Sequence, residues 1–369
     1  MNGQLTAKKL AVRTASGLVV LIAVMAVCSL VGTEKVSLKA IVDGIGSRGT
    51  VNPPNVARPS WPCFHGLEAR GTNNWRINPD YEIFVRVRVP RIFLAAIVGA
   101  ALACSGVVCQ ALLRNPLADP YILGISSGAG LGVIIAIISG LSWTFAGRSP
   151  IAVFAFVGAL GTVWLVWFLG RLTGKFYVTG LLLAGVVVNT FFSALIMFLT
   201  LVAKSQQVYA TIFWLMGNMM EEDFLVLWVG AGCVVGGVLA LFYIAPQLNA
   251  LSFGENDARS MGVNTARTHI IAFGVAAFIT AIAVSLSGLV GFVGLVVPHA
   301  VRLVFGPDHR QLLPLSGIVG AIFLVVADTF ARIVVAPAQL PVGVVTAIVG
   351  GPFFLVLLIK YGRKVSWLK

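Results

Sequence analysis

Long apolar stretches, separated by short polar segments, occupy most of the chain. A helix that crosses a bilayer needs about 20 mostly apolar residues, and by this rule the pattern predicts ten spanning helices. The predicted spans cover residues 15–33, 92–113, 121–140, 150–170, 177–202, 224–245, 270–286, 288–306, 311–334 and 341–360. The uncharged stretch at 270–301 is too long for one ordinary span, so we place a break at residues 285–288.

The spans predict an all-α integral membrane protein whose helices form one compact bundle. Small residues recur at the spacing that brings helices close together in lipid, as at Gly99 and Ala103 or Ser105 and Cys109. The group formed by spans two to five starts on the outer side of the membrane, whereas the group formed by spans seven to ten starts on the inner side. This opposite parity favours an inverted-repeat relation between the two groups, which is a common architecture in transporters.

The segments between the spans divide into inner and outer ones. Residues 1–14 and 361–369 are the inner tails, 15–33 is the first helix, and 92–360 is the core, with an inner loop at 246–269. Residues 34–91 form a long outer loop, whose proline-rich part at 49–80 looks like an insertion. The N-terminus resembles a secretory signal, but no small-x-small cleavage site precedes a soluble domain, so we expect an uncleaved first helix.

Basic residues indicate the orientation of this topology. The inner segments hold Lys8, Lys9, Arg13, Arg114, Arg171, Lys175, Arg259, Arg267, Arg302, Arg310, Lys360, Arg363, Lys364 and Lys369. The short outer loops hold only Arg148, Lys204 and Arg332. The positive-inside rule therefore places both termini in the cytoplasm, and we expect the chain to lie in the inner membrane. The long outer loop is also basic, but long loops translocate largely regardless of charge.

Composition agrees with a membrane protein and weakens other classes. The chain is 58% hydrophobic and only 11% charged, whereas soluble domains are about a quarter charged. The net charge of +13 is scattered between apolar segments, which argues against nucleic acid as a partner and for membrane lipid. Five cysteines and four widely separated histidines have no ligand spacing, so we expect no metal site.

No enzyme signature is complete. The segment 170–175 resembles a phosphate-binding loop, but it has three residues between its glycines, and Phe176 stands where Ser or Thr is required. The glycines at 124–130 follow no strand and suit helix packing better than a dinucleotide site. We therefore expect no catalytic residues and no cofactor bound by this chain.

Two polar features remain. Asp328 and Arg332 lie four residues apart in the ninth span, which marks either a functional site or a local ion pair. In the inner loop 246–269, Glu255 and Asp257 precede Arg259, and Gly262 follows. This charge order suits a short helix, which would be either a docking element for another protein or a plain connector.

Several stretches resemble the FecCD-type permease family, the membrane subunits of binding-protein-dependent ATP-binding-cassette (ABC) importers for iron–siderophore, haem or vitamin B12. They are Arg88-Val-Pro-Arg91; Gly99-Ala-Ala-Leu with Ser105-Gly106 and Gln110; Arg114-Asn-Pro-Leu-Ala-Asp-Pro120; Gly124-Ile-Ser-Ser-Gly128; Leu182-Leu-Ala-Gly185; Trp214-Leu-Met-Gly217; Gly254-Glu; Ala258-Arg-Ser-Met-Gly262; Gly291-Phe-Val-Gly-Leu-Val-Val-Pro-His299; Asp308-His-Arg310; Ala327-Asp328; Ala331-Arg332; and Leu340-Pro-Val-Gly-Val-Val-Thr346. The match runs in order over about 86–363.

The resemblance implies a transport complex. Two such permeases, here a homodimer, would pair with two cytoplasmic ATPases that use ATP and Mg, and with an extracytoplasmic substrate-binding protein. The substrate would pass along the dimer axis by alternating access. Iron–siderophore is our first choice of substrate, with cobalamin and haem as alternatives. A stand-alone carrier or channel is the alternative from another class, which the absence of midplane carboxylates disfavours.

The resemblance also implies roles for particular residues. Arg88, Arg91 and Arg332 match the outer residues that pair with carboxylates of the binding protein; the alternative for Arg88 and Arg91 is that they anchor the second span at the headgroups. The positions that match the ATPase-coupling helices are Gly254, Glu255, Ala258, Arg259 and Gly262. Asn115 and Leu117 match a cytoplasmic gate, and Val178 and Thr179 lie at the second gate, although these two depart from the polar pattern expected there. Arg86 adds charge to the family's outer motif.

Overall fold

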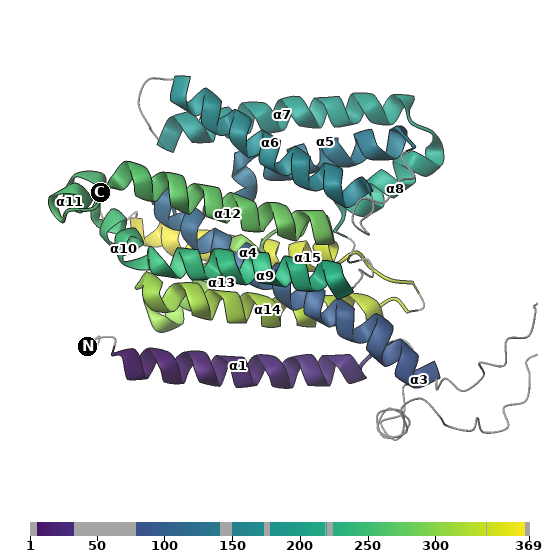
Figure 1. Ribbon diagram of the computed structural model, residues 1–369, viewed down its shortest axis with the longest axis horizontal. Helices are drawn as coiled ribbons and strands as arrows, with labels where there is room; N and C mark the ends of the chain where they lie inside the picture. The colour runs from purple at the N-terminus through teal and green to yellow at the C-terminus, as the bar shows by residue number, and fades with distance from the viewer. Residues whose placement is uncertain are drawn as a thin grey trace, which may run out of the picture.

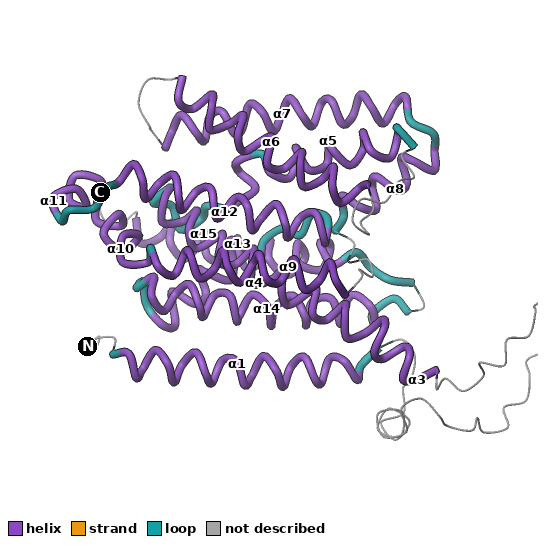
Figure 2. The backbone as a smooth tube through the Cα atoms, in the orientation of Figure 1, coloured by secondary structure: helices purple, strands orange, loops and turns teal. Residues whose placement is uncertain are grey.

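The computed structural model describes residues 6–32, 79–140, 150–172, 178–217, 219, 224–336 and 338–365. Within these ranges the chain forms helices joined by turns and contains no strand (Figures 1 and 2). The predicted insertion at 49–80 and the outer loop that contains it lie outside the described residues, apart from the segment that begins at Pro79.

Each of the ten predicted spans corresponds to a helix. They are α1 (Ala7–Leu30), α4 (Val89–Leu112), α5 (Ile125–Ile138), α6 (Pro150–Leu172), α7 (Val178–Val202), α9 (Phe224–Tyr243), α12 (Thr265–Ser287), α13 (Val293–Phe305), α14 (His309–Ile333) and α15 (Val342–Val365). Seven of these regions are long and apolar enough to cross a membrane, whereas α5, α13 and the apolar part of α15 are shorter. A multi-pass all-helical membrane protein is thereby confirmed.

Shorter elements complete the chain. They are α3 (Pro79–Glu82), the π-helix η1 (Ile83–Arg88), the 3-10 helix η2 (Pro120–Leu123), α8 (Ser205–Leu215), α10 (Ala245–Phe253) and α11 (Glu255–Ser260). The helical rod that contains α4 therefore begins well before residue 92, where hydropathy placed it. The reason is that Arg86, Arg88 and Arg91 lower the hydropathy of its first turns without interrupting the helix.

Helix α4 lies at the centre of the molecule. It packs against α9, α12, α13 and α14, while α5, α6 and α7 form a neighbouring layer, and α1 lies along α14 (Figure 1). Both termini lie at the same end of the bundle as α10 and α11, and α3 lies at the opposite end. We call these the coupling end and the outer end. This agrees with the ten predicted spans, because an even number of membrane crossings places both termini on the same side of the membrane.

The break predicted at 285–288 is confirmed. Helix α12 ends at Ser287, Gly288 has a positive φ of 67°, and α13 starts after Phe292, whose φ is 68°. Before α5 the chain is interrupted in the same way, by η2 and by Gly124 with a φ of 77°. A short helix after an irregular segment therefore occupies the second place in both halves.

The packing of α4 and α12 also follows the predicted inverted repeat. Helix α4 contacts α13 and α14 of the second half, and α12 contacts α5 and α6 of the first half. This exchange of partners, together with the matching interruptions, supports a symmetric relation between α4–α7 and α12–α15.

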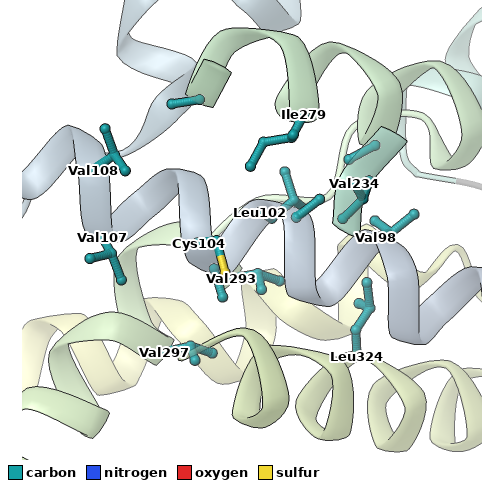
Figure 3. Packing of buried hydrophobic residues seen from close by; sticks show 14 of the residues in the cluster. Val98, Leu102, Cys104, Val107, Val108, Val234, Ile279, Val293, Val297 and Leu324 are labelled. Carbon is teal, nitrogen blue, oxygen red and sulfur yellow. The ribbon is translucent and has the colours of Figure 1, made fainter. Parts of the chain in front are cut away.

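Close backbone contact fixes α4 against its neighbours. A Cβ on Gly106 would lie 1.9 Å from the carbonyl oxygen of Gly294, and one on Gly99 would lie 2.2 Å from that of Gly320. Around these contacts, side chains such as Val98, Leu102 and Leu324 fill the space between α4, α9, α12 and α14 (Figure 3). Because lipid is as apolar as these side chains, close packing rather than water exclusion holds the helices together.

Candidate functional site

Asp328 organises a buried polar cluster at the outer end of the bundle. Its carboxylate accepts hydrogen bonds from Nε of Arg91 at 3.0 and 3.3 Å, and from Nε of Arg332 at 3.1 Å. Arg91 also donates from Nη1 to Oε1 of Gln339 at 2.8 Å, and Arg332 donates from Nη2 to Oγ1 of Thr329 at 3.1 Å. Asp328 thus joins the start of α4 to the end of α14.

Arg88 connects the first helix to the same end of the bundle. Its Nη1 donates to the carbonyl oxygens of Ser29 and Leu30 at 3.2 and 3.1 Å, so it binds the C-terminal turn of α1. A positive group suits this position because the last carbonyls of a helix carry partial negative charge. Gly32 leaves room for this side chain, because a Cβ there would lie 2.8 Å from Nη2 of Arg88, which would then have to shift.

The three arginines assigned to the outer mouth therefore do lie at one end, but they are not free surface charges. Arg88, Arg91 and Arg332 are 4%, 8% and 6% exposed, and their guanidinium groups have the internal partners just described. Asp328 is fully buried between two of them. The i, i+4 spacing revealed one ion pair, whereas no sequence pattern could reveal the contact to Arg91, 237 residues away. The docking role of these arginines stays a prediction.

At the coupling end, the loop predicted at 246–269 forms two consecutive helices, α10 and α11. The expected short helix is present as α11, and Gly254, with a φ of 141°, makes the sharp turn between the two. Ala258 is fully buried against the bundle, whereas Phe253 and Met261 are 73% and 62% exposed on either side of α11. Gly262, with a φ of 81°, follows the helix end, as its sequence position predicted.

Polar contacts fix α11 only loosely. Arg259 lies 3.8 Å from Glu255 in an i, i+4 pair whose side chains are 64% and 34% exposed, a type of pair that contributes little. Arg259 also donates from Nε to Oγ1 of Thr265 at 3.1 Å, and Nε2 of His269 lies 3.9 Å from Glu255. An exposed helix with apolar flanks and weak internal contacts is well suited to engage another protein.

Asn249 attaches this segment to α14. Its Nδ2 donates to Oδ1 of Asp308 at 2.8 Å, and its Oδ1 accepts from the backbone N–H of His309 at 2.8 Å. Asp308 also accepts from the backbone of Arg310, so it caps the start of α14. Sequence analysis missed Asn249, because an Asn in a predicted loop gives no sign of a partner 59 residues further on.

The structure describes the side chains of the first predicted gate segment but not those of the second. Asn115 is exposed just after α4 and accepts from the backbone N–H of Leu117 at 3.0 Å, which tightens the turn. Leu117 is half-buried. Val178 begins α7, but the side chains of Val178 and Thr179 lie outside the described part of the structure. Neither gate assignment is tested by these contacts.

Comparison with known proteins places the chain in a family. Residues 18–360 match the model of the FecCD transport family. The chain is 39% identical to the cobalamin import system permease protein BtuC of Halobacterium salinarum over 96% of this chain and 97% of that protein. It is 40% identical to the hemin transport system permease protein HmuU of Yersinia pestis, over 76% of this chain and 84% of that protein.

A solved structure shares the fold as well. It is described as a metal-chelate type ABC transporter in an inward-facing conformation, and it covers 93% of this chain and 98% of its own with a TM-score of 0.73 and 28% identity. The family match, the relatives and the helical architecture agree with the resemblance seen in the sequence. The chain belongs to the FecCD transport family and is the membrane-spanning permease subunit of an ABC importer.

Proposed function

We propose that this permease moves a metal chelate into the cytoplasm by alternating access, driven by separate ATPase subunits. The observation that carries the proposal is the α10–α11 segment, which is exposed at the coupling end and attached through Asn249 to α14. The chain itself binds no ATP in this proposal. ATP and Mg act on the partner ATPase, and the permease is a transport subunit rather than an enzyme.

The proposed orientation places the coupling end, with both termini, in the cytoplasm. The excess of Lys and Arg in the segments at that end supports it, because short basic loops stay on the inner side of a membrane. The outer end, with α3 and the Asp328 cluster, then faces the extracytoplasmic side of the cell's inner membrane. A substrate-binding protein would approach from there.

The coupling step would start at α11. Two ATPases that close on ATP would move α11 through its exposed flanks at Phe253 and Met261, with Gly254 and Gly262 shaping the contact and Ala258 holding it to the bundle. Asn249 would pass this displacement to the start of α14. Because α14 runs from Asp308 to the Asp328 cluster, one helix would connect the ATPase to the outer mouth.

At the outer end, the proposal assigns docking of the binding protein to Arg88, Arg91 and Arg332. One carboxylate, Asp328, pairs with two of these guanidinium groups, those of Arg91 and Arg332, so this pair of arginines retains positive charge that carboxylates of a partner would balance. Docking would require these buried side chains to become more accessible. The partners proposed are a second copy of this chain in a homodimer, two ATPases and the binding protein, with Asn115, Leu117, Val178 and Thr179 closing the path between the two permeases.

The substrate proposal is a metal chelate of the siderophore, cobalamin or haem class. Iron–siderophore was preferred from the sequence, but similarity does not separate the classes, because the cobalamin and hemin relatives are 39% and 40% identical. Cobalamin is the second candidate, but coverage does not choose between the classes: the cobalamin permease of Halobacterium salinarum aligns over 96% of this chain, whereas the vitamin B12 permease of Escherichia coli aligns over 78% and the hemin permease over 76%.

Reconstitution tests the proposal. The permease is placed in liposomes with and without its ATPase and binding protein, and uptake of labelled cobalamin, ferric siderophore and haem is measured. We expect ATP-dependent uptake of one chelate only when all components are present. Uptake by the permease alone would establish the stand-alone carrier instead. Replacing Arg88, Arg91 and Arg332 by Glu should abolish binding-protein capture, and undiminished capture would refute that docking assignment.

A further inference from the structure

An apolar groove lies on the side of the bundle between α1 and α9. It has a volume of about 750 Å³, and its lining comes from these two helices and from α4 and α14 beneath them. Leu18 and Trp228 line it from the two sides, and both are exposed, at 45% and 68%. Phe93 of α4 lies beside Trp228, with ring centroids 6.4 Å apart. The lining is almost entirely apolar.

The groove is long enough for a hydrocarbon chain. Its lining extends from Thr14 to Met25 on α1, which at the rise of an α-helix is about 16 Å. On α9 it extends from Phe224 to Leu239, or about 22 Å. One leaflet of a bilayer has a hydrocarbon layer of about 15 Å, half of the whole core. Within a membrane, a space of this length and polarity excludes water and is filled by an apolar chain.

Basic side chains mark one end of the groove. On α14, Arg310 is exposed and lies one helical turn before Pro314, which lines the groove. On α1, Arg13 directly precedes Thr14, and its guanidinium is held by Gln311 at 2.7 Å and lies 5.5 Å from the centre of the Phe305 ring. Both arginines are at the coupling end, where the headgroup of a lipid in that leaflet would lie.

We propose that this groove binds one anionic phospholipid from the leaflet at the coupling end. Its hydrocarbon chain would lie between α1 and α9, and its phosphate would contact Arg310 and Arg13. No residue of α10 or α11 lines the groove; at its other end, Val89 and Pro90 of the lining directly precede Arg91, which binds Asp328. It depends only on the chain being a membrane protein, and so does not depend on the transported substrate.

Native mass spectrometry tests the site on the full chain. The protein is reconstituted with equal amounts of dioleoylphosphatidylglycerol and dioleoylphosphatidylcholine, extracted gently, and the retained lipids are counted. We expect one phosphatidylglycerol to be retained in preference to phosphatidylcholine. Arg310→Gln should lower that retention about fivefold, the effect of one basic residue on an anionic lipid. Arg171→Gln, which removes an exposed arginine near the end of α6, is the matched control and should change nothing.

A second pair of variants tests the groove itself. Ala231→Trp fills the groove from α9 and should remove both lipids, whereas Val229→Trp, at an exposed position of α9 outside the lining, should not. If Ala231→Trp does not yield a monodisperse protein, Leu18→Trp fills the groove from α1. Equal retention of the two lipids by the wild type, or unchanged retention in the filled variants, would overturn the proposal. Occupation of the groove by a second copy of the chain, instead of a lipid, would also overturn the proposal.

Discussion

The two ends of α14 are held to their neighbours in different ways. At the outer end, Asp328 is fully buried and binds Arg91 of α4 and Arg332 of its own helix. At the coupling end, Asp308 caps the helix and binds half-buried Asn249 of α10 through one neutral donor. The first contact joins helices of the core, and the second joins the core to an exposed segment. From this comparison we predict that the outer end resists displacement more strongly than the coupling end does.

The largest effect is expected at the buried carboxylate. Asp328→Asn keeps the shape of the side chain but removes the negative charge between Arg91 and Arg332. Breaking a buried pair by removing one partner costs roughly 3–5 kcal/mol, because the remaining charge is left uncompensated. We expect a large drop in the thermal stability of the purified permease, measured as its half-life at elevated temperature.

Two variants complete this measurement. Asp257→Asn removes an exposed carboxylate of α11 and should leave the half-life nearly unchanged. Adding Arg332→Gln to Asp328→Asn removes one of the two stranded charges and should restore part of the loss. Wild-type stability in Asp328→Asn alone would show that the two ends of α14 do not differ in this way.

An intermediate effect is expected at the other end of the helix. Asn249→Ala removes the donor to Asp308 and the acceptor for the backbone N–H of His309. A hydrogen bond to a charged group contributes about 1.5–3 kcal/mol, and partial exposure places this one at the lower limit. We expect a modest loss of thermal stability and, in the full transporter, less substrate moved per ATP hydrolysed.

The matched control for this variant is Asn256→Ala, which makes the same change on the exposed side of α11. This control should not change the melting temperature of the permease. If Asn249→Ala keeps both the melting temperature and the ratio of transport to hydrolysis, α14 does not receive its movement through Asn249.

Much of the fold could be predicted from the sequence, because a membrane span imposes an apolar length that hydropathy detects. All ten spans and the break near Gly288 were found in this way. The short helix α11 was also predicted, since its acidic start and terminal Gly262 are local signals. Helix α10 and the early start of the α4 rod were missed. Both are helical segments whose polar residues hide them from a hydropathy rule.

The contacts between distant segments could not be predicted. Arg91 and Asp328, or Asn249 and Asp308, meet because the bundle brings their helices together, and no local spacing records that. The arginines at the outer end show the consequence. Their positions were predicted correctly for one end of the molecule, but their burial was not, because burial depends on neighbours from other helices.

The smallest effect is expected within α11 itself. Glu255 and Arg259 form an exposed i, i+4 pair at 3.8 Å, which contributes about 0.3–0.5 kcal/mol at most. A double-mutant cycle with Glu255→Gln and Arg259→Gln, followed by thermal unfolding of the isolated permease, should therefore give a coupling energy near this limit. The same variants should lower ATP-dependent transport far more than they lower stability, because the exposed face of α11 is proposed to contact the ATPase. Transport that falls only in proportion to stability would mean that α11 is a connector, and the contrast between the two ends of α14 would then concern packing alone.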